Sequence, residues 1–105
     1  MKSELIEAIN STAVRNYPNE MVGYVKDGEF FELENISKDP QNRYQLSISD
    51  KMFLYTHGID ALVHSHTRLD NRPSEMDLAA QRATKFCFWI VGTNGKEVTD
   101  IKEVV

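Results

Sequence analysis

The sequence predicts an α+β fold in which helices pack on a mixed β-sheet. Three observations indicate this class. Segments with helical and strand periodicity follow one another in the order helix, hairpin, strand, short helix, strand, helix and two strands. Asp27-Gly28 and Asn94-Gly95 are turn dipeptides, and the second leads into a last strand that ends near Val105. The most apolar run, FCFWIV at residues 86–91, is typical of a central strand covered on both faces.

The first predicted element is an amphipathic helix. Ser3 is placed to cap this helix, and Glu4 lies beside the positive end of the helix dipole. Pro18 sets its end, because proline cannot continue a helix and restricts the residue before it. The apolar residues of this stretch recur at helical spacing and predict one buried face: Leu5, Ile6, Ile9 and Ala13.

Two strand-like runs follow, at residues 21–26 and 29–34. Asp27-Gly28 joins them and suits a two-residue turn with positive φ, so together they predict a hairpin. Turn residues fill positions 37–43. The next apolar residues alternate with polar ones, as in a half-buried strand: Tyr44, Leu46 and Ile48.

The second half of the chain predicts two helices around a strand. A short helix over residues 50–56 is closed by Gly58, and residues 59–66 form a largely apolar strand. After a loop over residues 67–73, Ser74 opens a helix that runs to about residue 83. Its apolar residues are predicted to face a core: Met76, Leu78, Ala79 and Ala83.

Length and composition predict a single minimal domain over residues 1–105. With a net charge of -4 and scattered lysines and arginines, we expect no nucleic-acid partner. We expect no membrane partner, because the N-terminus lacks a signal-like apolar region and no apolar run could span a bilayer. The single cysteine, Cys87, forms no internal disulfide and excludes zinc sites built from several thiolates.

The stretch VHSHTRLDNRPSEMD, residues 63–77, is the most informative for chemistry. Positions i and i+2 of a strand point to one face, so His64 and His66 project side by side and can chelate a cation. Asp77, at the start of the next helix, can supply a third ligand. Such a set leaves a tetrahedral zinc one open position, where a bound water has its pKa lowered to roughly 7 and becomes a hydrolytic nucleophile.

A simpler interpretation of the same residues needs no metal. Ser74-x-x-Asp77 ahead of apolar residues resembles a capping box with aspartate in place of glutamate, and the spacing alone favours capping. A His-x-His pair in isolation is weak evidence, because histidines near strand ends often hydrogen-bond to backbone or water. The strand pair, the loop, and the serine and acid at a helix start together favour a metal site.

The spacing of these residues resembles a known signature. His64-Ser65-His66, seven residues, Ser74, two residues and Asp77 match without gaps the His-x-His-x7-Ser-x2-Asp signature of the JAMM (MPN+) zinc metallopeptidases. The resemblance implies a JAMM/MPN-like (cytidine-deaminase-like) fold, a mixed sheet flanked by helices. It also implies Zn²⁺ bound by His64, His66 and Asp77, with Ser74 orienting the reaction intermediate.

The resemblance extends upstream and assigns a base. YPNEMVGYV, residues 17–25, is similar to the family segment that carries a catalytic glutamate, which implies that Glu20 is the general base and proton shuttle. Nothing in the spacing alone selects Glu20 from the 16 acids. Val22, Tyr24 and Thr67 depart from residues common in the family; none of them is a metal ligand, but they alter the pocket walls and the loop.

Among the branches of the family, the chain most resembles the N-terminal JAMM domain of lambda-type phage tail assembly proteins. The segments YPNEMVGY, NISKDPQNRYQLS and FWIVG carry this similarity. It implies a peptidase or isopeptidase in tail assembly, a protein or peptide substrate of which a phage tail protein is one candidate, and a place in the host cytoplasm or on the virion tail. A cysteine-peptidase-like domain usually follows in such proteins, so with the chain ending at Val105 we expect that half to be absent or to be encoded separately as a partner.

Two alternatives remain open. One is a non-catalytic structural or interaction module of the tail, in which the metal only ties the strand to the helix. The other is a RadC-like or sulfur-carrier-processing JAMM protein, because related His-x-His and Ser-x-x-Asp patterns occur in such proteins. A protein ligand that fills the open coordination position would favour the structural module.

Overall fold

A five-stranded mixed sheet forms the centre of the fold, which a computed structural model describes for residues 2–105. The strand order is β2-β1-β3-β4-β5; β3 and β4 are parallel, and the other neighbouring pairs are antiparallel. The α+β class is therefore confirmed. The elements are α1 (Ser3–Asn16), β1 (Val22–Lys26), β2 (Glu29–Leu33), α2 (Ile48–His57), β3 (Ala61–His66), α3 (Glu75–Thr84), β4 (Phe88–Gly92) and β5 (Lys102–Val104).

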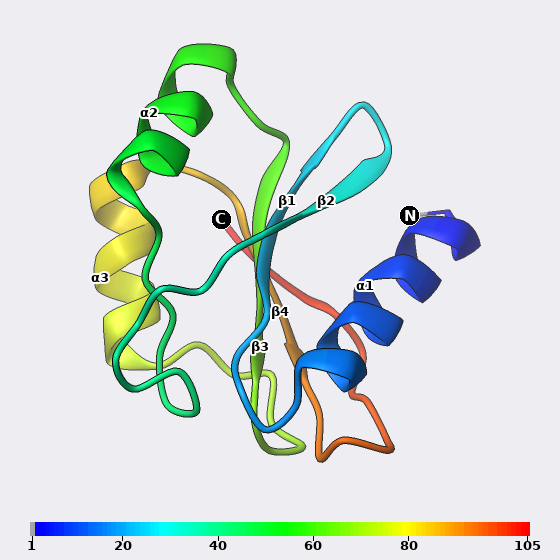
Figure 1. The fold of residues 1–105 in the computed structure, drawn as a ribbon. Coiled ribbons are helices and arrows are strands. Elements are labelled where there is room, and N and C mark those ends of the chain that lie inside the picture. The colour runs from blue at the N-terminus through cyan, green and yellow to red at the C-terminus, as the bar shows by residue number, and fades with distance from the viewer. Residues whose placement is uncertain (1) are drawn as a thin grey trace.

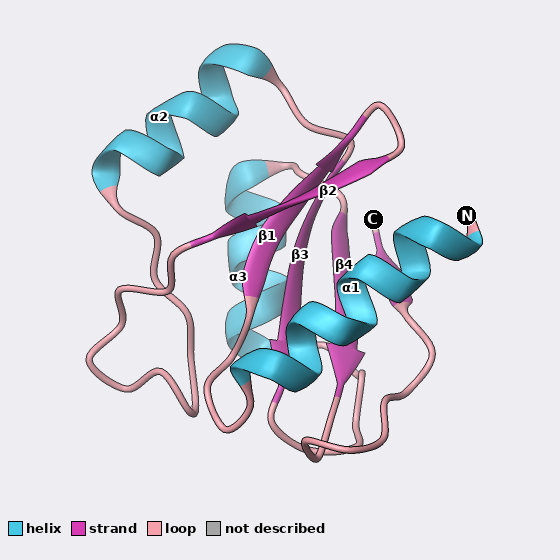
Figure 2. Cartoon of the chain, turned by 45° about the vertical axis from the view of Figure 1, so that its right-hand side comes forward, coloured by secondary structure: helices cyan, strands magenta, loops and turns pink. Residues whose placement is uncertain are grey.

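The helices lie on both faces of the sheet, with α1 on one side and α2 and α3 on the other (Figures 1 and 2). Each side has its own apolar cluster. Ile9 of α1 packs with Val63 and Val91 of the sheet, whereas Leu54 of α2 packs with Leu62 on the opposite face. Within residues 2–105, no helix combines the length and the apolar character that crossing a membrane requires.

Helix α1 follows the predicted stripe but not the predicted cap. Ile9 and Ala13 are fully buried, and the helix ends at Asn16, ahead of Pro18 as expected. Ser3 is not the N-cap, because it already has helical conformation. Lys2 takes that position with extended backbone and makes no side-chain cap hydrogen bond.

The predicted hairpin is confirmed. β1 and β2 pair in antiparallel register, with Lys26 opposite Glu29 across the turn. Asp27 has φ 54° and Gly28 has φ 79°, so both central residues occupy the positive-φ region that this kind of turn requires. The hairpin places β2 at one edge of the sheet and β1 next to the central strand β3.

The strand predicted around Tyr44, Leu46 and Ile48 is wrong. Leu46 is buried, but Ile48 is 77% exposed and begins α2, two residues before the predicted helix start. The reason is local capping: the Ser47 side chain accepts a hydrogen bond from the backbone N–H of Asp50 at 3.1 Å, which turns the chain into a helix before a third alternating position is reached.

The burial predicted for the last helix is also wrong. Asp77 is the buried residue of α3, whereas Met76 is 60% exposed and Ala79 and Ala83 are also exposed. Ser74 and Asp77 form a capping box that fixes the rotation of the first turn, so the carboxylate rather than the methionine points at the sheet. Ala80 packs against the apolar cluster on this side.

The most apolar run of the sequence forms β4, which is interior but not central. β4 lies between β3 and β5, and β3 is the middle strand. Phe86 and Cys87 precede the strand, and the side chain of Cys87 is half-buried rather than fully buried within a strand. The Asn94-Gly95 turn leads as predicted to the last strand, which ends at Val104.

We predict that Ile9→Ala lowers the free energy of unfolding by about 2–5 kcal/mol, because it leaves a cavity under α1. Ile48→Ala is the matched control, since it removes the same atoms from a side chain that is 77% exposed, and should change stability by less than about 0.5 kcal/mol. Urea unfolding of the two variants measures both values. Equal losses would contradict the packing of α1 on the sheet.

Candidate metal centre

Strand β3 presents both histidines to the side of the sheet that carries α3. His64 and His66 are two residues apart, so their rings point to one face, and they are 0% and 3% exposed. Their ring centroids lie 5.2 Å apart. Ser65 points to the opposite face, where its hydroxyl accepts a hydrogen bond from the backbone N–H of Met21 at 2.7 Å.

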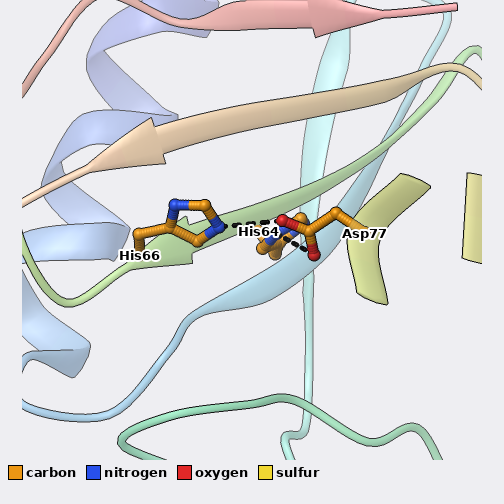
Figure 3. Close-up of side chains that lie close together, drawn as sticks. All are labelled: His64, His66 and Asp77. Carbon is orange, nitrogen blue, oxygen red and sulfur yellow. Dashed lines mark hydrogen bonds and ion pairs between the residues drawn. The ribbon is translucent and has the colours of Figure 1, made fainter. Parts of the chain in front are cut away.

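Asp77 reaches the two imidazoles from the first turn of α3. Its Oδ1 lies 3.1 Å from Nε2 of His64, and its Oδ2 lies 3.0 Å from Nε2 of His66. Figure 3 shows the carboxylate directed at both rings. Oδ2 also accepts the backbone N–H of Ser74 at 2.9 Å, so the capping box aims the carboxylate. The two interpretations of the motif are therefore compatible, because the same residue caps the helix and faces the histidines.

This donor set has the chemistry of a divalent-ion site. One ligand atom from each of His64, His66 and Asp77 lies within 4.8 Å of the others. Neighbouring ligand atoms around a tetrahedral zinc at about 2.0–2.2 Å are about 3.3 Å apart, so a small closing of the three side chains would hold the ion. Neither ring nitrogen of His64 makes a well-directed hydrogen bond with any residue in 2–105, despite the short distance to Asp77. A buried imidazole nitrogen without a hydrogen bond is expected of a metal ligand.

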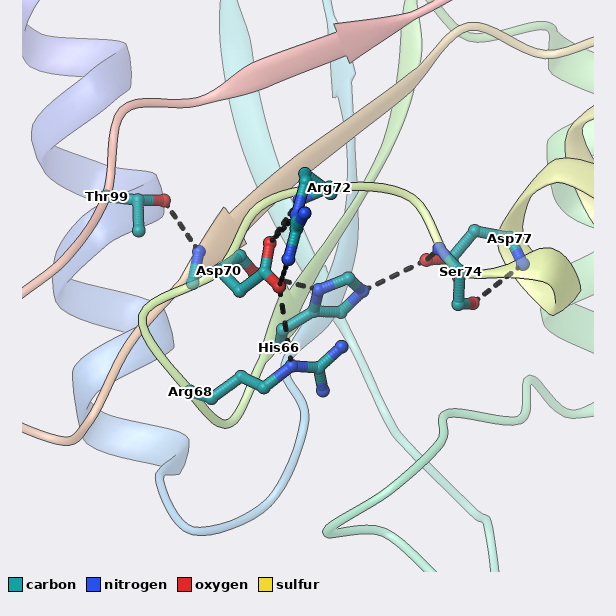
Figure 4. A network of polar contacts seen from close by, with 8 residues as sticks. His66, Arg68, Asp70, Arg72, Ser74, Asp77 and Thr99 are labelled. Carbon is teal, nitrogen blue, oxygen red and sulfur yellow. Dashed lines mark hydrogen bonds and ion pairs between the residues drawn. The ribbon is translucent and has the colours of Figure 1, made fainter.

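Backbone atoms orient His66. Its Nδ1 lies 2.9 Å from the carbonyl oxygen of Asp70, which selects the tautomer whose Nε2 lone pair faces the site. Asp70 belongs to the loop that follows β3, and Arg72 donates to its carboxylate (Figure 4). This loop crosses the end of β4 at Gly92, where a Cβ would collide with backbone atoms of Arg68 and Asp70. Only glycine leaves room for that crossing.

Glu20 stands beside this group in the segment between α1 and β1. It is 6% exposed. Its backbone N–H donates to the carbonyl of Pro40 at 2.7 Å, and its carbonyl accepts from the side chain of Asn35 at 3.0 Å. Burial raises the pKa of the Glu20 carboxyl to about 7, with the Asp77 charge adding to the rise and His66 opposing it. A carboxyl with this pKa exchanges a proton near neutral pH.

The pKa values of the other ionisable groups at the site are shifted in different directions. Burial lowers the pKa of His64, which favours the neutral ring that coordinates metals. Although burial opposes it, hydrogen bonds to Asp77 and to the Asp70 carbonyl raise the pKa of His66. Although burial opposes it, the close contacts of Asp77 with His64 and His66 hold the pKa of this carboxyl well below its usual range, so the carboxylate is ionised.

A cavity of about 440 Å³ opens next to these residues. Glu20, His66, Ser74 and Asp77 line one end of it together with Arg68. The Ser74 hydroxyl accepts the backbone N–H of Asp77 at 3.1 Å, which leaves its own proton available to a group in the cavity. Four of the five residues singled out from the sequence therefore line this cavity, and the fifth, His64, is buried in the sheet beside Asp77.

Three contributions to the site were not predicted. The Asp70 carbonyl has no side-chain signature, so no sequence pattern could reveal it. Tyr44 lies with its ring centroid 4.8 Å from that of His64, but the alternating pattern indicated a strand there. Ser65 anchors the segment that carries Glu20, and its position between the two histidines already places it on the other face of the strand.

A family model and a curated protein match most of this chain. The family model described as prokaryotic homologs of the JAB domain matches residues 2–104. The tail tip assembly protein K of Escherichia phage N15 is 33% identical over 96 residues, which are 87% of this chain and 40% of that protein. The chain thus spans about two fifths of the length of this curated relative.

Two solved structures share the fold. A solution structure of a Desulfitobacterium hafniense protein superposes with a TM-score of 0.70 at 18% identity, covering 97% of this chain and 80% of that one. The crystal structure of a JAB1/MPN domain protein from Archaeoglobus fulgidus gives a TM-score of 0.59 at 22% identity, covering 96% and 90%. Both similarities support the arrangement of helices around the mixed sheet.

We predict that Glu20→Gln changes the pH dependence of stability in metal-free protein. The folded-state pKa of about 7 lies above the reference value of 4.5, so between these values the folded chain holds a proton that the unfolded chain has released. The stability of the parent chain therefore falls as pH rises through this window. A neutral glutamine avoids this loss, so the variant should be the more stable chain above pH 7, by roughly 1–3 kcal/mol, and similar to the parent near pH 4.

Urea unfolding at pH 4, 6 and 8 measures this difference. Glu29→Gln is the matched control, because Glu29 lies exposed at the start of β2 and away from the cavity. Its pH profile should follow that of the parent. A difference between Glu20→Gln and the parent that stays constant with pH would contradict the burial of this carboxyl.

Proposed function

Because the chain belongs to the Prok-JAB family, the prokaryotic homologs of the JAB domain, we propose that it is a zinc-dependent peptidase or isopeptidase that hydrolyses an amide bond. One observation carries the proposal: a cluster of two imidazoles and a carboxylate shares a cavity with a buried carboxyl of raised pKa. A metal site with a purely structural role needs no general base, whereas hydrolysis at neutral pH needs a group that accepts a proton from the attacking water.

His64, His66 and Asp77 are the residues that would hold the ion. Zinc bound there supplies Lewis acidity, which lowers the pKa of a water and polarises the carbonyl of the scissile bond. The chain's own contribution to these ligands is orientation, because the capping box fixes Asp77 and the Asp70 carbonyl fixes His66. Strand β3 then fixes the spacing of the two rings.

Glu20 is proposed as the general base and proton shuttle. With a pKa of about 7 it is partly ionised at neutral pH, so it accepts a proton from the attacking water and afterwards returns it to the nitrogen of the leaving amine. The water oxygen bonds to the carbonyl carbon as the carbon–nitrogen bond breaks. Backbone contacts to Pro40 and Asn35 hold Glu20 at the cavity, so the carboxyl is positioned before substrate arrives.

Ser74 is proposed to stabilise developing charge on the carbonyl oxygen. Its hydroxyl oxygen is already engaged as acceptor for the backbone N–H of Asp77, which orients the hydroxyl. Its proton has no part in that contact and can be donated to a group in the cavity that Ser74 lines. A preoriented donor of this kind lowers the barrier because it needs no reorganisation during the reaction.

The setting we propose is the assembly of a phage tail tip. The phage N15 relative is named for that process, and this chain corresponds to about two fifths of its length. The substrate would then be a tail protein, processed in the host cytoplasm or on the forming virion, and a cysteine-peptidase-like protein would act alongside this chain. The same relative favours this setting over a RadC-like or sulfur-carrier function.

A non-catalytic tail module is the second candidate. One observation favours it: the two Asp77 oxygens contact both histidines directly, so protein atoms alone tie α3 to β3. Under this alternative an ion only strengthens the link. The two candidates differ in what Glu20 does, because a structural link gains nothing from a buried carboxyl of raised pKa.

We predict that the parent chain binds one zinc ion and that His64→Ala and Asp77→Ala each weaken zinc affinity by more than about 100-fold. Loss of groups that merely support a ligand costs 10–100-fold, so loss of a ligand costs more. His57→Ala is the matched control, because His57 lies exposed at the end of α2 and should leave affinity unchanged. Competition with a chromophoric chelator measures the constants. Equal affinity in all four chains would reject the site.

We predict that Glu20→Gln keeps zinc but lowers the rate of peptide cleavage by about 10²–10⁴-fold, the range for a lost general base. Zinc is retained because Glu20 is outside the converging ligand set. Mass spectrometry of a peptide library, incubated with zinc-loaded parent or variant chain, measures turnover. Glu29→Gln, on the exposed hairpin, should cleave like the parent. Equal cleavage by Glu20→Gln and parent would reject the assigned base.

A further inference from the structure

The cavity continues well beyond the candidate metal centre. The rest of its lining includes an apolar group formed by Leu54 of α2, Leu62 of β3, and Phe86 and Phe88, and the ring of Phe88 lies with its centroid 6.1 Å from that of His64. At about 440 Å³ it falls within the range of ligand pockets, roughly 300–1,000 Å³. A water and the scissile amide occupy only the polar end of such a volume. The apolar end is therefore available to another part of the substrate.

The helices that wall the cavity leave apolar side chains uncovered at its mouth. α2 buries Leu54 and α3 buries Asp77, while neither helix buries another residue. Tyr55 of α2 and Met76 of α3 both line the cavity and are each 60% exposed. Apolar side chains gathered around a concave opening mark a binding site rather than ordinary surface.

The charges around the cavity are distributed unequally. Its basic lining residues are Arg43, Lys51 and Arg68, and its acidic lining residues, Glu20 and Asp77, belong to the metal end. Arg43 lies 3.8 Å from Asp39 and Arg68 lies 3.9 Å from Asp70, so Lys51 is the basic lining residue that forms no ion pair within residues 2–105. The whole chain carries a net charge of -4, so this basic group is a local feature and not a property of the composition. A ligand with negative charge next to an apolar group would complement both parts of the wall.

We propose that this cavity selects the substrate: it binds a peptide segment that carries a large apolar side chain flanked by acidic residues. This rests on the proposed peptidase function, because the same cavity ends at Glu20 and Ser74. The apolar side chain enters between α2 and α3 and contacts Leu62 and Phe88. The acidic flanks lie near Lys51 and Arg43, and the scissile amide lies at the polar end.

Blocked pentapeptides test the selection directly. They carry a central leucine, phenylalanine or serine between two aspartates, or a central leucine between two lysines. Calorimetry measures their binding to the zinc-loaded Glu20→Gln chain, in which turnover is suppressed. The leucine and phenylalanine peptides with aspartate flanks should bind at least about tenfold more tightly than the other two. Equal binding of the leucine and serine peptides would overturn the proposal.

Matched variants locate the binding. Ala83→Trp places a large side chain in the cavity from an exposed helical position and should weaken binding of the leucine peptide at least about tenfold. Ala79→Trp is its control, on the same helix but outside the cavity. Lys51→Glu should remove the preference for aspartate flanks, and Lys96→Glu, in the distant Asn94-Gly95 turn, should not. Unchanged binding by Ala83→Trp and Lys51→Glu would overturn the proposal.

Binding and cleavage separate this inference from the peptidase function. One outcome is that the leucine peptide binds selectively but the zinc-loaded parent chain cleaves none of the peptides. That outcome would count against the peptidase function and support the cavity as a recognition site. Cleavage of peptides without any preference at the central residue would support the peptidase and overturn the selection proposed here.

Discussion

The contact of the Asp77 carboxylate with two imidazoles is the interaction on which this side of the molecule depends. Asp77 is the one fully buried residue of α3, and Ala80 packs only partly buried against the apolar cluster, so a polar contact does much of what an apolar stripe does in most helices. The capping box makes that contact possible because it fixes Asp77 in the first turn. The position of the helix and the geometry of the site therefore have one cause.

The segment between α1 and β1 is held by a second set of contacts from three directions. Met21 exchanges hydrogen bonds with Ser65 in β3, while Pro40 and Asn35 hold the backbone of Glu20. Ser65 lies between the two histidines and on the opposite face of the strand. One short strand thus carries the ligands on one face and, through the contacts that Ser65 makes with Met21 from the other face, anchors the segment that brings Glu20 to the same cavity.

Local patterns predicted much of this fold and the candidate site. The stripe of α1, the Asp27-Gly28 turn and the His64, His66 and Asp77 constellation each depend on the spacing of a few neighbouring residues. The errors occurred where tertiary or capping contacts decide the outcome. Capping by Ser47 ended the apparent strand, and the capping box turned α3 away from its apolar residues. The role of Glu20 came from a family resemblance, because burial raises its pKa only in the folded chain.

The crossing at Gly92 shows why a ligand motif alone does not define a working metal centre. The loop carbonyl that orients His66 passes over the end of β4, where only a hydrogen atom on the α-carbon leaves space. A relative with all its ligands intact but a larger residue at this point would have a displaced imidazole and a poorly assembled centre. Surveys that separate active from inactive members should therefore weigh this strand end along with the histidines.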